Sequence, residues 1–193
     1  TLVEQELQKA QKVGSNRPLP YNEGNLDFLA EYIVNTHHTY VKNNLPEISG
    51  YAAKVARVHG HNHPELLRIN QLVEAISSEF SSHLVKEEQV LFPYIKRMAA
   101  AKNNKESFQQ SSNGSVKGTI NMMEIEHESA GKNMSEIRTL SNDFSLPEDA
   151  CASYSLLFRL LEEFEEDLHT HVHLENNILF PKAIELEKEL ITK

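Results

Sequence analysis

The feature that most constrains this fold is a short motif that occurs twice in the chain. Residues 83–93 read HLVKEEQVLFP, and residues 171–181 read HVHLENNILFP. Both follow the pattern His-x-x-x-Glu-x-x-x-Leu-Phe-Pro, so each contains a His and a Glu four residues apart. On a helix this spacing places the two side chains one turn apart on the same face. The chain must therefore fold so that two helices can each accommodate such a His–Glu face.

Two helices that face one another with these pairs would gather two imidazoles and two carboxylates inside a bundle. Nitrogen together with carboxylate oxygen is the ligand set that non-haem iron favours, and helix bundles build di-iron sites from inward side chains of this kind. A buried carboxylate is costly unless it is paired or bound to a metal. The alternative is two exposed helical turns that share a His/Glu pair by chance. The identical position of Leu-Phe-Pro in both copies argues against that alternative.

The rest of the chain favours one all-α domain. At 193 residues it is long enough for a bundle with a sizeable core, and it contains only 7 Gly and 7 Pro. Segments with helical period dominate. We therefore predict an up-down four-helix bundle over residues 25–193, preceded by a polar lead-in or linker over residues 1–24.

Composition excludes several classes of partner and site. A net charge of −9 argues against nucleic acid or an anionic membrane as the main partner. No apolar run approaches the roughly 18 residues that a membrane span needs, and the N-terminal residues lack the apolar core of a signal peptide. The single cysteine, Cys151, excludes an internal disulfide and a Cys-rich metal site, which favours a reducing, cytoplasmic location.

The helix boundaries follow from capping residues and prolines. The first helix is predicted from the N-cap Asn25 to about Asn44, where Leu45-Pro46 stops it, and a short helix follows around 49–59. The second helix runs from Pro64 to Pro93 with one or two further turns, and a surface loop follows over 102–117. The third helix covers 118–141, and the fourth begins at Leu146-Pro147 and continues past Pro181.

Apolar residues at alternating steps of three and four define a core-facing stripe on three helices, and a His interrupts each stripe. The stripes are Ile69, Val73, Ile76, Phe80, His83, Glu87 and Val90 on the second helix, Ile120, Met123, His127, Ala130, Met134 and Ile137 on the third, and Leu157, Leu160, Phe164, Leu168, His171, Glu175 and Ile178 on the fourth. A lone His on such a face is usually a core histidine. Three of them, with two Glu in register, favour metal ligands.

The first helix offers two adjacent histidines. Its apolar stripe passes through His37 and His38, and periodicity alone leaves both open. His38 lies on the line through Val34, Val41 and Leu45, which favours it over His37.

These motifs resemble those of the hemerythrin-like di-iron proteins for repair of iron centres, the RIC or ScdA-like family. The resemblance extends from about Leu26 to Pro181 and rests on KEEQVLFP, MEIEHESAG and LENNILFP. It implies a hemerythrin-like bundle that holds two non-haem iron ions per chain, joined by an oxo or hydroxo bridge. By motif, the implied metal ligands are His38, His83, Glu87, His127, His171 and Glu175. Glu87, and not the adjacent Glu88, keeps the four-residue spacing.

The resemblance also implies a function. Such proteins repair iron–sulfur clusters damaged by nitrosative or oxidative stress, with apo or damaged iron–sulfur proteins as partners and NO or O2 as small ligands. Oxygen-carrying hemerythrins use more histidines, so a four-His site should hold iron less tightly, which favours donation over carriage. Full-length family members carry a short N-terminal domain with a cysteine pair. Nothing in this chain matches that domain, so we expect no function here that depends on those cysteines.

Three alternatives remain open at this stage. They are a module that binds or senses O2 or NO reversibly, a ferroxidase-like oxidase and a purely structural bundle. The fate of the metal after exposure to NO or peroxide separates the first two from iron donation. A homodimer is compatible with the pattern, because an exposed apolar stripe cannot be told from the core by pattern alone.

The remaining histidines have plainer interpretations. His169 and His173 are four residues apart and could form a second metal clip, but their phase favours positions outside the core. His59, His61 and His63 lie among Gly and Pro residues, so we expect a surface turn. We expect His37 at the periphery of the site.

Two further residues deserve a specific expectation. Glu126 belongs to an acidic helix face, for which solvation is the default, although a carboxylate beside a ligand can orient a metal-bound imidazole or line a polar path to the metal. Cys151 precedes an apolar run, so we expect a small core residue and not a redox thiol.

Overall fold

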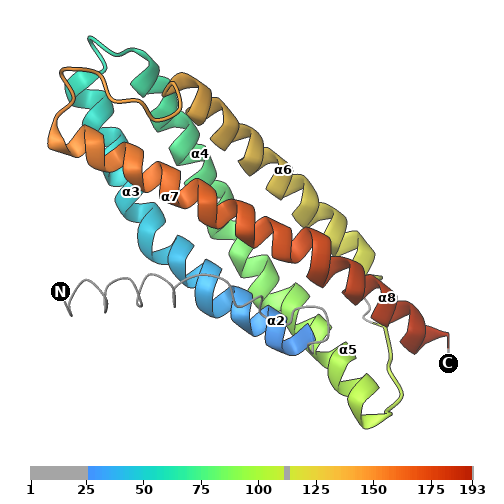
Figure 1. Cartoon of the computed structure of the whole chain (residues 1–193). Helices are drawn as coiled ribbons and strands as arrows, with labels where there is room; N and C mark the ends of the chain where they lie inside the picture. Colours follow the sequence, from blue (N-terminus) through green and yellow to red (C-terminus); the bar gives the residue numbers. More distant parts are fainter. Residues whose placement is uncertain (1–25, 111–113, 193) are drawn as a thin grey trace, which may run out of the picture.

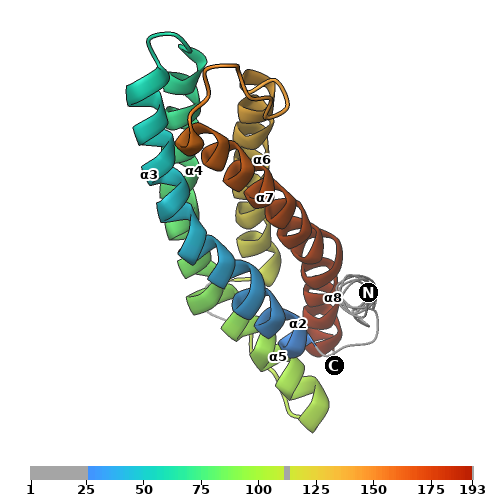
Figure 2. The ribbon, with the colours of Figure 1, turned by 60° about the vertical axis from the view of Figure 1, so that its left-hand side comes forward.

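The computed structural model describes residues 26–110 and 114–192, and the regular structure in these residues is helical throughout. Four long helical segments run side by side, each antiparallel to the one before it in the chain (Figure 1). They stay together along the same length when the molecule is turned (Figure 2). The predicted all-α, up-down four-helix bundle is therefore confirmed. The predicted lead-in over residues 1–24 and the N-cap Asn25 lie outside the described residues.

Three of the four segments consist of two α-helices joined by a short π-helix. In chain order the segments are α2 (Leu26–Ile33), η1 (Val34–His38) and α3 (Thr39–His59); α4 (Glu65–Lys86), η2 (Glu87–Leu91) and α5 (Phe92–Asn104); α6 (Val116–Leu140); and α7 (Ala152–Leu174), η3 (Glu175–Leu179) and α8 (Phe180–Ile191). Helix α3 packs against α4 and α7, and α4 packs against α6. Toward the other end of the bundle, α5 packs against α2 and α8.

Each π-helix has a predicted metal ligand at one end. η1 ends at His38, η2 begins at Glu87 and η3 begins at Glu175. A π-turn holds one residue more than an α-turn, so the buried face moves one residue further along the sequence. As a result Leu91 is buried, whereas Val90, which the stripe places in the core, is 49% exposed. The prediction of an unbroken stripe is wrong at Val90 for this reason.

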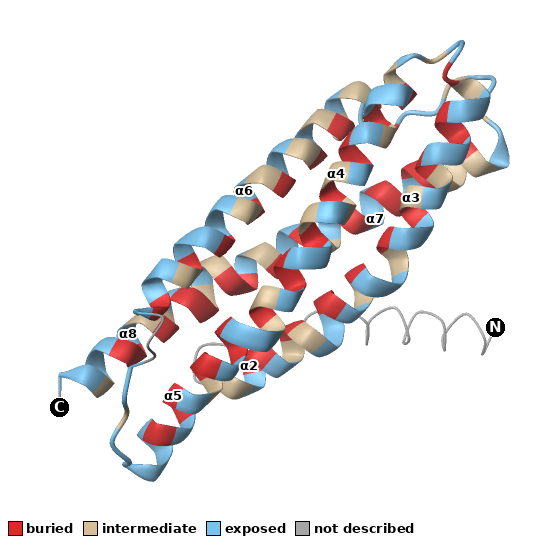
Figure 3. Cartoon of the chain, turned by 180° about the vertical axis from the view of Figure 1, so that it is seen from behind, coloured by how far each residue is buried: buried red, intermediate tan, exposed pale blue. Residues whose placement is uncertain are grey.

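The buried apolar residues form two clusters along the bundle, and the red bands in Figure 3 follow the inner faces of the helices. One cluster includes Phe80, Leu84 and Leu168, and the other includes Leu91 and Leu174. Along the second and fourth segments, the predicted ligands lie where residues of the first cluster give way to residues of the second. The metal-ligand candidates therefore form a polar layer within an otherwise apolar core.

The first segment does not stop where the sequence predicts. Pro46 lies inside α3, and the predicted short helix around 49–59 is the continuation of the same helix. A proline in a helix interior removes one backbone hydrogen bond and costs about 3 kcal/mol. Leu45 and Ile48 beside it are both buried, and burial of each side chain stabilises the fold by about 2 kcal/mol. This packing keeps the helix intact.

The other boundaries agree with the sequence to different degrees. α6 lies within two residues of the predicted third helix, and α5 extends the second segment to Asn104, so the predicted loop begins later than expected. The fourth segment does not open at Pro147, because α7 begins at Ala152. Pro147 lies in a turn instead, in which the Ala150 N–H donates to the Pro147 carbonyl at 3.1 Å. A proline suits a turn as well as a first helical turn, so the local pattern could not separate the two.

Within the described ranges, none of the helices combines the length and the apolar composition that crossing a membrane would require.

Candidate metal centre

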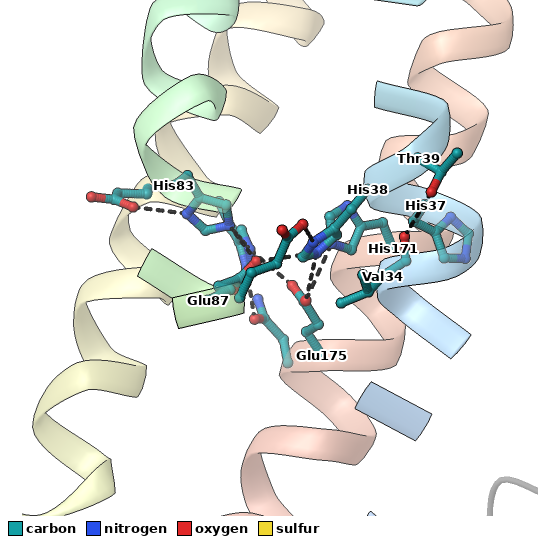
Figure 4. A network of polar contacts seen from close by, with 12 residues as sticks. Val34, His37, His38, Thr39, His83, Glu87, His171 and Glu175 are labelled. Atoms are coloured by element: carbon teal, nitrogen blue, oxygen red, sulfur yellow. Dashed lines mark hydrogen bonds and ion pairs between the residues drawn. The ribbon is translucent and has the colours of Figure 1, made fainter. Parts of the chain in front are cut away.

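Six polar side chains from all four segments meet in the layer between the two apolar clusters. They are His38, His83, Glu87, His127, His171 and Glu175, and each is at most 4% exposed. Figure 4 shows the labelled members of this set pointing toward one another from separate helices. They are the six residues that the sequence selects, so the structure brings the whole predicted set together.

The six side chains form two overlapping groups. His38 and His171 make one group with Glu87 and Glu175, and His83 and His127 make the other with the same two carboxylates. Within each group the potential ligand atoms all lie within 4.8 Å of one another. We call them the His38/His171 group and the His83/His127 group. These are the groups of this kind that the described part of the chain contains, and both Glu87 and Glu175 belong to both.

Several contacts inside the groups join atoms that both present lone pairs when the imidazoles are neutral. The Nε2 atoms of His83 and His127 are 3.0 Å apart. In neutral rings whose Nδ1–H groups are donated elsewhere, each Nε2 presents only a lone pair, so the two atoms repel one another unless a cation lies nearby. Both oxygens of Glu87 and of Glu175 are buried, and none makes a hydrogen bond with the described residues. Such atoms fit a bound metal, because unpaired buried charge is otherwise costly.

Three of the four imidazoles are oriented from their outer side. His38 donates its Nδ1–H to Glu88 at 2.8 Å, His83 donates to Glu126 at 2.8 Å, and His127 donates to the amide oxygen of Asn176 at 2.9 Å. Metal-binding histidines usually make such a bond, because it fixes the ring and the tautomer that leaves Nε2 free for the metal. The outward bonds therefore direct three Nε2 atoms toward the centre.

The two sequence motifs supply these outer partners in the same way. The residue after each motif Glu accepts the bond from a histidine on a neighbouring helix: Glu88 from His38, and Asn176 from His127. The motif Phe then stacks on that same imidazole, with Phe92 at 5.5 Å from His38 and Phe180 at 6.1 Å from His127 between ring centroids. The shared Leu-Phe-Pro thus has a physical role, because its Phe packs against a candidate ligand of the next helix.

Opposite charges shift the pKa values inside the layer. Burial alone would lower the pKa of His38, but the neighbouring carboxylates of Glu175 and Glu87 outweigh this effect and raise the pKa to about 9. His83 follows the same pattern, with burial opposed by Glu87 and Glu126, and its pKa is also raised. Burial would raise the pKa of Glu175, but the surrounding imidazoles hold it well below its ordinary value. The layer therefore favours ionised carboxylates.

The two outer carboxylates each have a lysine partner. Glu88 binds Lys42 at 2.6 Å, and Glu126 binds Lys86. Burial would raise both carboxyl pKa values, but for each the lysine and the histidine together lower it. Glu126 thus orients a candidate ligand, which is the second of the two interpretations that its sequence allows. The sequence argument missed Glu88 and Asn176 as outer partners, although their shared position after the motif Glu was a visible signal.

His37 lies beside the site and belongs to neither group, in agreement with a peripheral position, but it is buried. It is 4% exposed, donates to Asp167 at 2.7 Å, and stacks on His171 with ring centroids 5.5 Å apart. Figure 4 shows its ring apart from those of His38 and His83. The π-turn of η1 explains its burial, because the wider turn places two consecutive histidines on the inner side of the segment.

The remaining sequence candidates lie away from the centre. His169 and His173 are exposed, and His61 lies in the exposed turn after α3, as expected. Cys151 is also exposed, so the expectation of a core cysteine is wrong. It precedes the first residue of α7 and contacts His59 at 3.1 Å, because the fourth helix begins later than its sequence suggested.

Known proteins match this chain over most of its length. A family model described as the hemerythrin HHE cation-binding domain matches residues 29–183. A probable iron-sulfur cluster repair protein of Haemophilus influenzae is 36% identical over 156 residues, which cover 81% of this chain and 64% of the relative. The iron-sulfur cluster repair protein YtfE of Yersinia pestis is 34% identical over 156 residues, 81% of this chain and 65% of the relative. The chain thus spans less than two thirds of the length of these relatives, and the matches agree with the resemblance that the motifs indicate.

Proposed function

The chain belongs to the hemerythrin HHE cation-binding family, and on this premise we propose that it is a di-iron protein that returns iron to damaged iron–sulfur clusters. The observation that carries the proposal is the overlap of the two groups. Each offers two imidazoles, and both share the same two carboxylates. A pair of metal ions with two common ligands is the arrangement that this overlap fits best.

In this proposal each group holds one iron ion. His38 and His171 would hold one ion, His83 and His127 would hold the other, and Glu87 and Glu175 would be available to both. Bridging carboxylates offset the repulsion between two cations and would hold them at the separation that an oxo or hydroxo bridge needs. Bound iron would supply the chemistry for small ligands such as NO or O2, because these six residues would not fill the coordination spheres of two ions.

The protein's own part is to orient the imidazoles. Glu88 and Glu126 accept the Nδ1–H of His38 and His83, so the Nε2 lone pairs face inward. Lys42 and Lys86 offset the added negative charge on those two carboxylates. The apolar clusters on both sides exclude bulk water from the layer, which strengthens its electrostatic interactions.

The choice of repair over oxygen carriage rests on two supports. Four imidazoles hold iron less firmly than a richer histidine set would. The matched relatives from Haemophilus and Yersinia are named as iron-sulfur cluster repair proteins. We therefore propose apo or damaged iron–sulfur proteins as the recipients of iron, in a reducing cytoplasmic compartment. Ferrous iron would leave more readily than ferric iron, because its lower charge weakens the bonds to carboxylate oxygen.

The test is an anaerobic transfer experiment. The iron-loaded protein, in its reduced and its oxidised form, is incubated with an apo iron–sulfur protein, and cluster assembly is followed by absorbance and EPR of the acceptor. We expect transfer from both forms and faster transfer from the reduced one. The matched control is the Glu175→Ala variant, which we expect to carry no iron and to support no assembly above added free iron.

Other outcomes would identify the other functions. Spectral changes with NO or O2 that reverse fully, without iron transfer, would indicate a binding or sensing module. Sustained O2 consumption that depends on added Fe(II) would indicate a ferroxidase. Either result without cluster assembly would overturn the repair proposal.

A further inference from the structure

The two groups offer the same types of ligand, two imidazoles and two carboxylates, but the outer hydrogen bonds to their imidazoles differ. Each contains one imidazole that donates its Nδ1–H to a carboxylate, His38 to Glu88 and His83 to Glu126, both at 2.8 Å. Each of these carboxylates also binds a lysine. The outer contacts of His38 and His83 are therefore equivalent, and the difference between the two groups lies in the outer contacts of their second imidazoles.

The second imidazoles differ in their outer contacts. In the His83/His127 group, His127 donates to Asn176 at 2.9 Å. In the His38/His171 group, the Nδ1 of His171 is buried and makes no hydrogen bond with any described residue. Loss of an outer partner typically lowers metal affinity by about 10- to 100-fold. The His38/His171 group therefore lacks one of the supports that the other group has.

His37 occupies the outer side of His171. Its ring lies nearly parallel to that of His171, at an interplanar angle of 10°, and its own Nδ1 is bonded to Asp167. The ring of His171 is thus positioned by stacking, and its Nδ1 makes no hydrogen bond with the described residues.

The outer supports of His38 border a hollow in the protein surface. A surface hollow of about 390 Å³ is lined by residues that include Glu88 and Phe92. These are the two side chains that hold the ring of His38, through a hydrogen bond and through ring stacking. An incoming chelating group can therefore reach the supports of the His38/His171 group from outside.

We propose that the iron bound by His38 and His171 is the exchangeable ion, and that the iron bound by His83 and His127 is the retained one. This inference rests on the proposed function, because it assumes that both groups hold iron. It assigns the donated ion to one place in the bundle and gives His37 a positioning role, as the ring that stacks on His171.

The test is the anaerobic release of iron from the fully loaded full chain to an excess of a ferrous chelator. We expect two phases of one iron each, with rates that differ by about tenfold or more. Glu88→Gln should accelerate the fast phase alone. Glu126→Gln and Asn176→Ala should accelerate the slow phase alone. Glu124→Gln, an exposed carboxylate on the same helix as Glu126, is the matched control and should change neither phase.

A spectroscopic readout separates positioning from general destabilisation. The protein is first loaded with an iron isotope that gives no Mössbauer signal. The ion that leaves in the fast phase is then removed and replaced with a Mössbauer-active isotope. A single doublet should result, and it should change in Glu88→Gln and His37→Phe but not in Glu126→Gln. Circular dichroism of each variant checks that the bundle is intact.

Three outcomes are decisive. Release of both ions in one phase, or acceleration of the first ion by Glu126→Gln, would overturn the assignment while leaving the di-iron proposal in place. A total of one iron per chain would instead count against the di-iron proposal. In that case the assignment is still tested, because it requires the single ion to respond to Glu126→Gln and not to Glu88→Gln.

Discussion

In the first motif, Glu88 and Phe92 hold the ring of His38, whereas in the second motif Asn176 and Phe180 hold the ring of His127. The inner residues of the two motifs are equivalent: each places a buried Glu at the start of a π-helix, within 3.3 Å of the motif histidine. The outer residues are not equivalent, because one motif offers a carboxylate and the other an amide. Repetition thus builds a nearly symmetric site, and single side chains outside it make the two halves different.

Removing the shared carboxylates should have the largest effect, because it destroys what the two motifs have in common. We expect Glu87→Ala or Glu175→Ala to lose both metal ions, since each carboxylate belongs to both groups. Glu88→Ala should only weaken binding, by about 10- to 100-fold at one ion. Metal content measured after gel filtration decides this. Greater loss in Glu88→Ala than in Glu87→Ala would show that the assigned helix phase is wrong by one residue.

The adjacent histidines of the first segment offer the next test. His38→Ala should lose one of the two ions, because His38 belongs to one group. His37→Ala should keep both, because His37 stacks on His171 and belongs to neither group. The stoichiometry of bound iron per chain measures both variants. The reverse result would transfer the ligand role to His37.

The motif phenylalanines test whether the two halves are equally well packed. Phe92 and Phe180 are both buried, so truncating either to Ala should lower the free energy of unfolding by about 3–5 kcal/mol. Denaturant titration of the metal-free variants measures the loss. We expect similar values for the two. A difference of more than about 2 kcal/mol would mean that packing, and not only the outer hydrogen bonds, separates the halves.

The pH dependence of the metal-free protein reports on His38. Its pKa is raised from 6.5 to about 9 by Glu175 and Glu87, so the folded state holds the proton more tightly than the unfolded state. The resulting stabilisation is fully present below pH 6.5 and is lost as the pH rises toward 9, at a cost on the order of 3 kcal/mol. Thermal unfolding between these pH values measures it. His38→Gln should flatten the profile, and an unchanged profile would contradict this origin.

The smallest expected effect comes from making the outer residues alike. Asn176→Asp would give His127 a carboxylate partner like that of His38. A stronger acceptor makes the imidazole a better donor to the metal, so we expect slower release of the more firmly held ion, by about tenfold or less. Chelator competition measures this rate, with Asn177→Asp as the exposed neighbouring control. Equal effects of the two substitutions would indicate a general charge effect.

Much of the site could be predicted from the sequence because helical period is a local property. A four-residue spacing fixes that His83 and Glu87 share a face, and an apolar stripe fixes that the face is buried. Repetition of the motif then indicates that two such faces meet. The bundle, and the helix and phase of each of the six candidate ligands, followed from spacing in this way, with the family motifs favouring His38 over His37.

The tertiary structure alone decided what surrounds those residues. The bonds from His38 to Glu88 and from His83 to Glu126 join residues that are 50 and 43 positions apart, so they depend on how neighbouring helices are aligned. Packing against other segments also decides the π-turns and the burial of His37. It likewise decides that α3 continues past Pro46. Local periodicity determines which face of a helix turns inward, whereas contacts between helices determine which side chains support that face from behind.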